Sequence, residues 1–214
     1  FKVILNVVLL QASSQLIATE IRDYPEWHRG RSDYGVWYIE IYQPEFISYL
    51  DGIRAQFSDL LIKSSQRQYH ITLFVCGFLT SHHPNFDDDF EIKTLNHQIE
   101  LLQQLQLEPF ELEITQINSF SSALFLHIHD QKNILSKIRK QLAQSSTEIA
   151  AVDYCPHITL GLYRENWPSD LVLQRIQKLP LKNMKVQVNQ LTFGYYKAQI
   201  LQGLLYPYHQ IQLG

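Results

Sequence analysis

The chain of 214 residues is long enough for one large domain or two small lobes, and 45% of its residues are apolar, which excludes disorder as the default state. Lys and Arg number 18 against 21 for Asp and Glu, and this formal net charge of -3 does not suit a protein that coats duplex DNA or other long nucleic acid. A short or terminal nucleotide is compatible with the charge.

Two isolated cysteines, Cys76 and Cys155, exclude a disulfide framework and a Cys-x-x-Cys metal knuckle, so we expect a reducing, cytoplasmic compartment. The apolar run at 3–10 contains Asn6 and is far shorter than the roughly 18 residues that span a bilayer. We expect it to pack as a helix or strand without membrane contact, with a targeting remnant as the alternative. Because the sequence begins with Phe1 and not Met, its native start is open.

Hydropathy periodicity predicts alternating strands and helices in the first half of the chain. Residues 34–42 alternate, with Trp37, Ile39 and Ile41 on one face, which indicates a half-buried strand. Further along we expect a helix opened by Pro44 and ending near 58, a strand over 68–78, an exposed loop over 79–91 and a helix over 92–105.

The second half is predicted to repeat this order. We expect strands over 110–117 and 123–129 around a turn at 118–122, then a helix over 132–144, a strand over 156–163, a helix from 168 to about 178, and tail strands over 184–195 and 204–213. Because no Gly- or Pro-rich linker divides the chain, it is expected to form a single unit. Its predicted parts are an N-terminal extension at 1–33, a first lobe at about 34–90, a second lobe at about 110–165 and tail strands at 184–213.

An internal repeat underlies this similarity. The tetrapeptide His-Ile-Thr-Leu begins at His70 and again at His157, an offset of 87 residues, and the strand before each copy obeys the same offset. With 9 His and eight Thr in the chain, fewer than about one His-x-Thr triplet is expected by chance. Two identical copies in register therefore indicate a functional motif.

Strand geometry predicts what the repeat does. Residues two apart project from the same face of a strand, so His70 and Thr72 share one face, as do His157 and Thr159. If the two halves face each other, two imidazoles and two hydroxyls converge. Such a set suits a small tetrahedral anion, because hydroxyls donate to its oxygens and imidazoles with pKa values near 6.5 act as base and acid.

The paired motifs and the duplicated strand-helix-strand order resemble the 2H phosphoesterase superfamily, which includes bacterial 2′-5′ RNA ligase-like proteins and RNA cyclic phosphodiesterases. The resemblance implies a bilobal α+β fold, in which two antiparallel sheets line a central groove and helices lie outside. It also implies metal-independent, cofactor-free hydrolysis of a 2′,3′-cyclic phosphate or a related phosphodiester. The motif match makes His70 and His157 the catalytic pair and Thr72 and Thr159 the phosphate-binding residues. The segment before Tyr34, which includes residues 27–31, lies outside the shared core and leaves room for an unusual substrate.

Two other functions stay open. The first is a 2′-5′ phosphodiesterase or reversible 2′-5′ RNA ligase, which needs a longer groove for two nucleosides. The second is a non-catalytic module that binds RNA ends or nucleotide phosphates. In all three cases the partner is a nucleotide or an RNA end, and we expect a monomer.

Strand parity supplies weaker candidates for substrate contact. Tyr38 and Phe125 are equivalent under the repeat, and either could stack on a base. Phe74 shares parity with His70, and Tyr163 with His157, so both could line the groove. His127 is a candidate auxiliary residue. For each of these five, ordinary packing or structural hydrogen bonding is the alternative.

The sequence offers two rival sites to the histidine pair, and one further candidate for phosphate contact. His82, His83 and the acidic run Asp87 to Asp89 could bind a cation, although such loops are usually only solvated. Cys155 and His157 project in parallel, which argues against a nucleophile-base pair. Arg29 and Arg31 could meet a second phosphate, but a solvated loop is the commoner explanation. No phosphate-binding Gly-rich loop is present, so a nucleotide triphosphatase is disfavoured.

Overall fold

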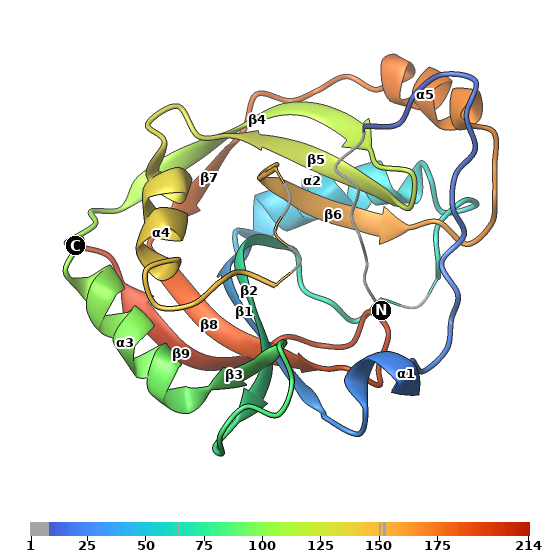
Figure 1. Ribbon diagram of the computed structural model, residues 1–214. Helices are drawn as coiled ribbons and strands as arrows, with labels where there is room; N and C mark the ends of the chain where they lie inside the picture. Colours follow the sequence, from blue (N-terminus) through green and yellow to red (C-terminus); the bar gives the residue numbers. More distant parts are fainter. Residues whose placement is uncertain (1–8, 64, 150, 152) are drawn as a thin grey trace.

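The computed structural model describes residues 9–63, 65–149, 151 and 153–214. The predicted N-terminal run at 3–10 therefore lies largely outside the described residues. Helices are interspersed among the strands along the chain (Figure 1). In chain order they are α1 (Pro25–His28), β1 (Asp33–Glu40), α2 (Pro44–Ala55), β2 (His70–Thr80), β3 (Asp89–Glu91), α3 (Ile92–Gln103), β4 (Phe110–Ser119), β5 (Ala123–His129), α4 (Ile134–Leu142), β6 (His157–Leu162), α5 (Ser169–Lys178), β7 (Lys185–Val188), β8 (Gln190–Lys197) and β9 (Tyr206–Gln212).

Most of the predicted elements are confirmed to within a few residues, and two predictions are wrong. The expected loop over 79–91 contains the end of β2 and the short strand β3, which pairs in parallel with β2. The expected strand over 184–195 is interrupted at Asn189, because β7 pairs with β4 whereas β8 pairs with β1. At Asn189 the chain crosses from one part of the sheet to the other.

The described strands form one strongly curled sheet of nine strands, where two sheets were expected (Figure 1). The order is β7-β4-β5-β6-β2-β1-β8-β9, with β3 beside β2, and every pairing except β2–β3 is antiparallel. We call β2, β1, β8 and β9 the first strand group, and β6, β5, β4 and β7 the second strand group. A single residue pair, Ile71 with Ile158, joins β2 of the first group to β6 of the second.

The offset of 87 residues also holds in the register of the strands. Tyr38 pairs with Thr72 and Phe125 pairs with Thr159, at corresponding places in the β1–β2 and β5–β6 pairings. Each pairing then shifts register at the equivalent residue, leaving Leu73 in β2 and Leu160 in β6 without a partner. The two strand pairs therefore share both their alignment and their β-bulge.

The main core lies on one face of the sheet. Apolar residues of α2, α3, α4 and α5 pack there against the strands, because each helix presents an apolar stripe. Two small clusters are separate from that core. One contains Tyr34, Tyr38 and Phe78 of the first strand group. The other contains Phe125 of the second strand group and Phe120, which directly follows β4. We refer to them as the first and second aromatic clusters.

A mostly buried ion pair supports β2 beyond its contact with β6. The Arg139 guanidinium of α4 donates to the carbonyl oxygen of Leu73 and lies 2.6 Å from a carboxylate oxygen of Glu148. The other Glu148 oxygen accepts from the Val75 N–H at 3.1 Å. The side chains of Arg139 and Glu148 thus supply hydrogen bonds to the main chain of β2 between its pairings with β6 and β3. Buried peptide groups need such partners.

The N-terminal segment connects the two strand groups. The N–H of Leu10 donates to the Ser119 carbonyl, and the N–H of Thr19 donates to the Tyr163 carbonyl, so this part follows the second group. Trp27 of α1 then packs on Tyr34 and Phe78 of the first group. Figure 1 shows the segment running along one side of the molecule between α5 and α1.

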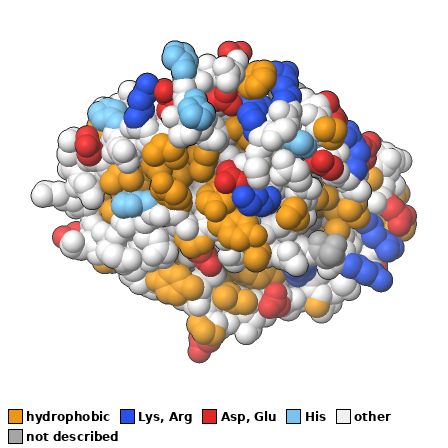
Figure 2. Space-filling model, turned by 90° about the horizontal axis from the view of Figure 1, so that it is seen from below, with side chains coloured by type: hydrophobic (Ala, Val, Ile, Leu, Met, Phe, Trp, Pro, Cys, Tyr) orange, Lys and Arg blue, Asp and Glu red, His pale blue; other side chains and the backbone are white. Residues whose placement is uncertain are grey.

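The outer surface carries several exposed apolar side chains. Figure 2 shows broad apolar areas, bordered by charged side chains, on the face seen from below the view of Figure 1. Tyr206 and Tyr208 on the edge strand β9 are 37% and 56% exposed. In the described part of the chain, no helix is long and apolar enough to cross a membrane.

Candidate active site

The two motifs meet at the junction of the strand groups. Because Ile71 pairs with Ile158 in antiparallel register, His70 stands opposite Thr159, and Thr72 stands opposite His157. The isoleucines are fully buried in the main core, whereas all four motif side chains are half-buried on the other face. We call this the histidine face. In this register the histidines are diagonal neighbours, about 7–8 Å apart at their backbones.

Both imidazoles are held in the same way. Nδ1 of His70 lies 2.8 Å from the carbonyl oxygen of Gln68, and Nδ1 of His157 lies 2.7 Å from that of Cys155. A carbonyl accepts only, so each Nδ1 carries a proton and each Nε2 of the neutral ring is the basic nitrogen. Neither Nε2 bonds to another described residue, so both are available to a ligand.

Burial keeps both imidazoles neutral near pH 7. Desolvation, reinforced by the positive charge of Arg67, lowers the pKa of His70 to about 4. Desolvation also lowers the pKa of His157, with a smaller contribution from His127. A bound anion would raise both pKa values again, because opposite charge favours the protonated imidazole. The hydroxyls of Thr72 and Thr159 make no hydrogen bond to any described residue.

The predicted stacking residues lie behind the imidazoles. Tyr38 makes an edge contact with His70 at 5.9 Å between ring centroids, and Phe125 makes the equivalent contact with His157 at 5.3 Å. Both rings are completely buried within the two aromatic clusters. They support the two imidazole rings and present no exposed face on which a base could stack.

Phe74 and Tyr163, which were expected on the histidine face, lie in the main core. The cause is the bulge at Leu73 and its equivalent at Leu160, because one extra residue in a strand reverses the alternation of side chains beyond it. The hydroxyl of Tyr163 instead makes a 2.6 Å hydrogen bond with the Ser119 hydroxyl.

A matched pair of tyrosines tests this description. The buried hydroxyl of Tyr38 has no partner among the described residues, whereas that of Tyr163 is bonded to Ser119. We expect Tyr163→Phe to lower the free energy of unfolding by about 1 kcal/mol and Tyr38→Phe to leave it unchanged or raise it. Urea unfolding of both variants measures the difference, and an equal loss in the two would contradict the assigned hydrogen bonding.

Three further polar residues lie near the site. His127 pairs across the sheet with His157, and its Nδ1 is 2.6 Å from the Thr115 hydroxyl. Glu40 stands at the equivalent position beside His70, and burial raises the pKa of its carboxyl group. Sequence analysis missed Glu40 and Arg67 as site residues. The repeat itself aligns Glu40 with His127 and could have identified Glu40, but Arg67 has no comparable signal.

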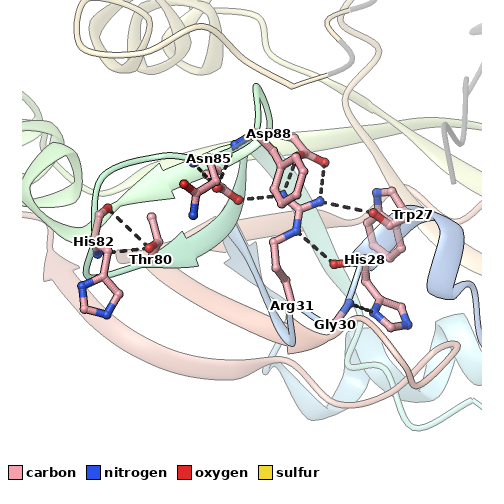
Figure 3. A network of polar contacts seen from close by, with 10 residues as sticks. Trp27, His28, Gly30, Arg31, Thr80, His82, Asn85 and Asp88 are labelled. Carbon is pink, nitrogen blue, oxygen red and sulfur yellow. Dashed lines mark hydrogen bonds and ion pairs between the residues drawn. The ribbon is translucent and has the colours of Figure 1, made fainter.

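The carboxylates of the acidic loop form ion pairs with an arginine of the same chain, Arg31. Arg31 binds Asp88 at 2.5 Å (Figure 3) and Asp89 at 2.6 Å. Its guanidinium also lies over the Phe78 ring. Arg31 is therefore not free to meet a second phosphate, and Arg29 lies over Phe86. Among the described residues, no group of three or more His, Cys, Asp or Glu side chains is placed to hold a metal ion. The loop thus fastens the N-terminal segment to β2 and β3.

Solved structures share this fold at low sequence identity. Escherichia coli LigT, crystallised with 3′-AMP, is 15% identical, with a TM-score of 0.59 over 85% of this chain and 98% of LigT. A Thermus thermophilus protein is 14% identical, with a TM-score of 0.57 over 84% and 97% of the two chains. A conserved Agrobacterium tumefaciens protein of unknown function is also 14% identical, with a TM-score of 0.55 over 86% and 85%.

Family comparison agrees with the motif. No curated protein matches the chain. A family model described as the 2′-5′ RNA ligase superfamily matches residues 43–199, which include both His-x-Thr motifs and the strands that carry them. The resemblance to the 2H phosphoesterase superfamily is thereby confirmed, and the chain belongs to the 2′-5′ RNA ligase superfamily.

Proposed function

We propose that the protein is a metal-independent phosphodiesterase that hydrolyses a 2′,3′-cyclic phosphate, or a related phosphodiester of a nucleotide or RNA end. The observation that carries this proposal is the repeated arrangement of His70 and His157. Each ring is fixed through Nδ1, has a free Nε2 and stands opposite the threonine of the other motif. Four groups that suit one phosphate thus lie on one face of the sheet.

The reaction follows from these groups. One neutral imidazole takes a proton from water through Nε2, and the water oxygen forms a bond to phosphorus. The bond from phosphorus to one ribose oxygen breaks, and the other imidazole, protonated, gives its proton to that oxygen. The hydroxyls of Thr72 and Thr159 donate to the non-bridging oxygens, where charge develops. The product is a phosphate monoester, and a proton passes from one histidine to the other through solvent before the next cycle.

Binding of the substrate supplies the protonated partner. Both imidazoles of the free protein have lowered pKa values, so most molecules hold two neutral rings at pH 7. A phosphodiester anion between them raises the pKa of both rings. Once one ring takes up a proton, its positive charge disfavours protonation of the other, so the bound state favours the base-acid pair that the reaction needs.

The comparisons support a phosphodiester reaction. Membership of the 2′-5′ RNA ligase superfamily is consistent with an enzyme that makes or breaks such bonds. LigT has been crystallised with 3′-AMP, with ATP and with NADP+, and we extend nucleotide binding to this chain as part of the proposal. Reversible 2′-5′ ligation and phosphate binding without turnover are the competing functions.

Hydrolysis of the four nucleoside 2′,3′-cyclic phosphates in excess chelator tests the proposal. We expect turnover that chelation does not reduce, and the phosphate isomer of the product shows which ribose oxygen leaves. Turnover only on 2′-5′-linked dinucleotides would favour the ligase-like function. Binding of product nucleotides without any turnover would favour the non-catalytic module, and a requirement for added metal would overturn the two-histidine reaction.

The pH profile provides an independent prediction. For kcat/KM the relevant pKa values are those of the free enzyme, and both are lowered from 6.5, that of His70 to about 4. The base stays neutral below pH 6.5 and activity is lost only as pH falls through its lowered pKa, whereas the acid loses its proton as pH rises. We therefore expect a bell-shaped profile with its maximum below pH 6.5. A maximum above pH 7.5 would contradict this assignment.

A further inference from the structure

Arg67 lies in the segment that enters β2, next to the aromatic side chains that support His70. Its Nε donates to the carbonyl oxygen of Gly203 at 2.5 Å, and its guanidinium carbon is 4.1 Å from the centre of the Tyr196 ring. Tyr196 packs on the first aromatic cluster, which contains Tyr38 and contacts His70. The positive charge of Arg67 is close enough to lower the pKa of His70.

This guanidinium lacks a counter-ion within the described part of the chain. Arg31 and Arg139, which are similarly half-buried, each bind a carboxylate at 2.6 Å or less. No carboxylate of a described residue lies within 4.0 Å of Arg67, and neither of its Nη atoms bonds to a described residue. Burial lowers its pKa without an opposing ion pair. A half-buried cation of this kind is stabilised by an anion, and a planar guanidinium with two free nitrogens suits a phosphate.

Arg67 also departs from the internal repeat. The residue 87 positions later is Tyr154, whose hydroxyl donates to the Thr72 carbonyl and whose ring lies under Arg139. The histidines, the threonines and their aromatic supports all obey the repeat, as suits groups that surround one phosphate. Arg67 has no equivalent beside the second motif. It therefore suits a part of the substrate that extends from that phosphate in one direction.

We propose that Arg67 binds a second anionic group of the substrate, the phosphate that links a terminal nucleotide to the preceding nucleotide. This inference rests on the proposed function and makes an RNA end the preferred substrate over a free cyclic mononucleotide. Because the Nε–Gly203 bond and the Tyr196 ring hold the guanidinium in place, little side-chain freedom is lost when the phosphate binds.

Two substrates that differ by one phosphate test the proposal. They are adenosine 2′,3′-cyclic phosphate and the same compound with a 5′-phosphate. The 5′-phosphate mimics the phosphate that links a terminal nucleotide to the preceding nucleotide. We expect the wild-type protein to prefer the 5′-phosphorylated compound by about tenfold or more in kcat/KM, since a charge-assisted hydrogen-bonded contact contributes about 1.5–3 kcal/mol. Arg67→Gln should reduce this preference to about one, and Arg67→Lys should restore part of it.

Lys140 provides a matched control, because Lys140→Gln removes one exposed positive charge from the outer helix α4 and should keep the wild-type preference. A wild-type preference of one would overturn the proposal, as would an Arg67→Gln variant in which both substrates slow equally. The second result would place Arg67 at the reacting phosphate.

Equilibrium binding separates this inference from the proposed function. If the wild-type protein hydrolyses neither compound, calorimetry with adenosine 2′-monophosphate and adenosine 2′,5′-bisphosphate still measures how much the second phosphate adds to the binding affinity. We expect the bisphosphate to bind about tenfold more tightly to the wild-type protein and with no advantage to Arg67→Gln. Equal affinities in the wild-type protein would contradict the subsite, whatever the outcome for turnover.

Discussion

Replacing either His70 or His157 with Ala is expected to lower kcat on a nucleoside 2′,3′-cyclic phosphate by about 10²–10⁴-fold. Each variant removes the imidazole to which the proposed reaction assigns proton transfer on its side of the phosphate, while the two threonines and the other imidazole remain. Because the histidines act together, the double variant should lose little more than either single variant. Steady-state hydrolysis with a fluorescent or chromatographic product assay measures the loss.

The fold should survive these changes. Both imidazoles are half-buried and outside the main core, so the circular dichroism spectrum and the unfolding transition should stay close to those of the wild-type protein. His97→Ala is a matched control, since His97 is exposed on the outer helix α3, and we expect its turnover to be unchanged. Full turnover in either His70→Ala or His157→Ala would show that the proposed reaction is wrong.

Replacing Arg139 with Met is expected to lower the free energy of unfolding by about 3 kcal/mol. The substitution leaves the mostly buried carboxylate of Glu148 without its cation and the Leu73 carbonyl without its donor. It also removes the ring contact with Tyr154, which holds the main chain of Thr72. Urea unfolding monitored by circular dichroism measures the loss.

A second arginine, Arg175, tests whether burial causes the large loss of stability expected for Arg139→Met. Arg175 binds Asp59 through two hydrogen bonds of 2.6 and 2.8 Å, but the two side chains are 32% and 56% exposed, against 17% and 13% for Arg139 and Glu148. We expect Arg175→Met to cost less than about 1 kcal/mol. The double variant Arg139→Met, Glu148→Met should recover part of the loss, because no unpaired charge remains buried. Equal losses in the two single arginine variants would refute the role given to the buried pair.

The internal repeat explains why so much of the site was predictable. Identical tetrapeptides with the same preceding strand must adopt the same local register, and the structure has that register in both strand pairs. The face of His70 and Thr72 follows from alternation alone. The face of Phe74 does not, because a bulge at Leu73 leaves no mark in the hydropathy pattern and reverses the side chains beyond it.

Pairing between strands that are distant in the sequence is the second reason why part of the fold could not be predicted. The strand expected over 184–195 is continuous in hydropathy, yet it divides at Asn189 because its two parts pair with strands of different groups. Arg67 is one of several arginines in the sequence. What distinguishes it is its packing on Tyr196, its bond to Gly203 and the lack of a carboxylate partner among the described residues. Such features depend on segments more than 100 residues away, which local periodicity does not encode.

A crystal structure with a nucleoside 3′-monophosphate bound tests the central claim most directly, because the claim is that both motifs contact one phosphate. We predict phosphate oxygens within about 2.6–3.2 Å of Nε2 of both His70 and His157 and of the hydroxyls of Thr72 and Thr159. Both Nδ1 atoms should keep their bonds to the carbonyl groups of Gln68 and Cys155. A phosphate that contacts only one of the two histidines, or that binds away from both, would contradict the account.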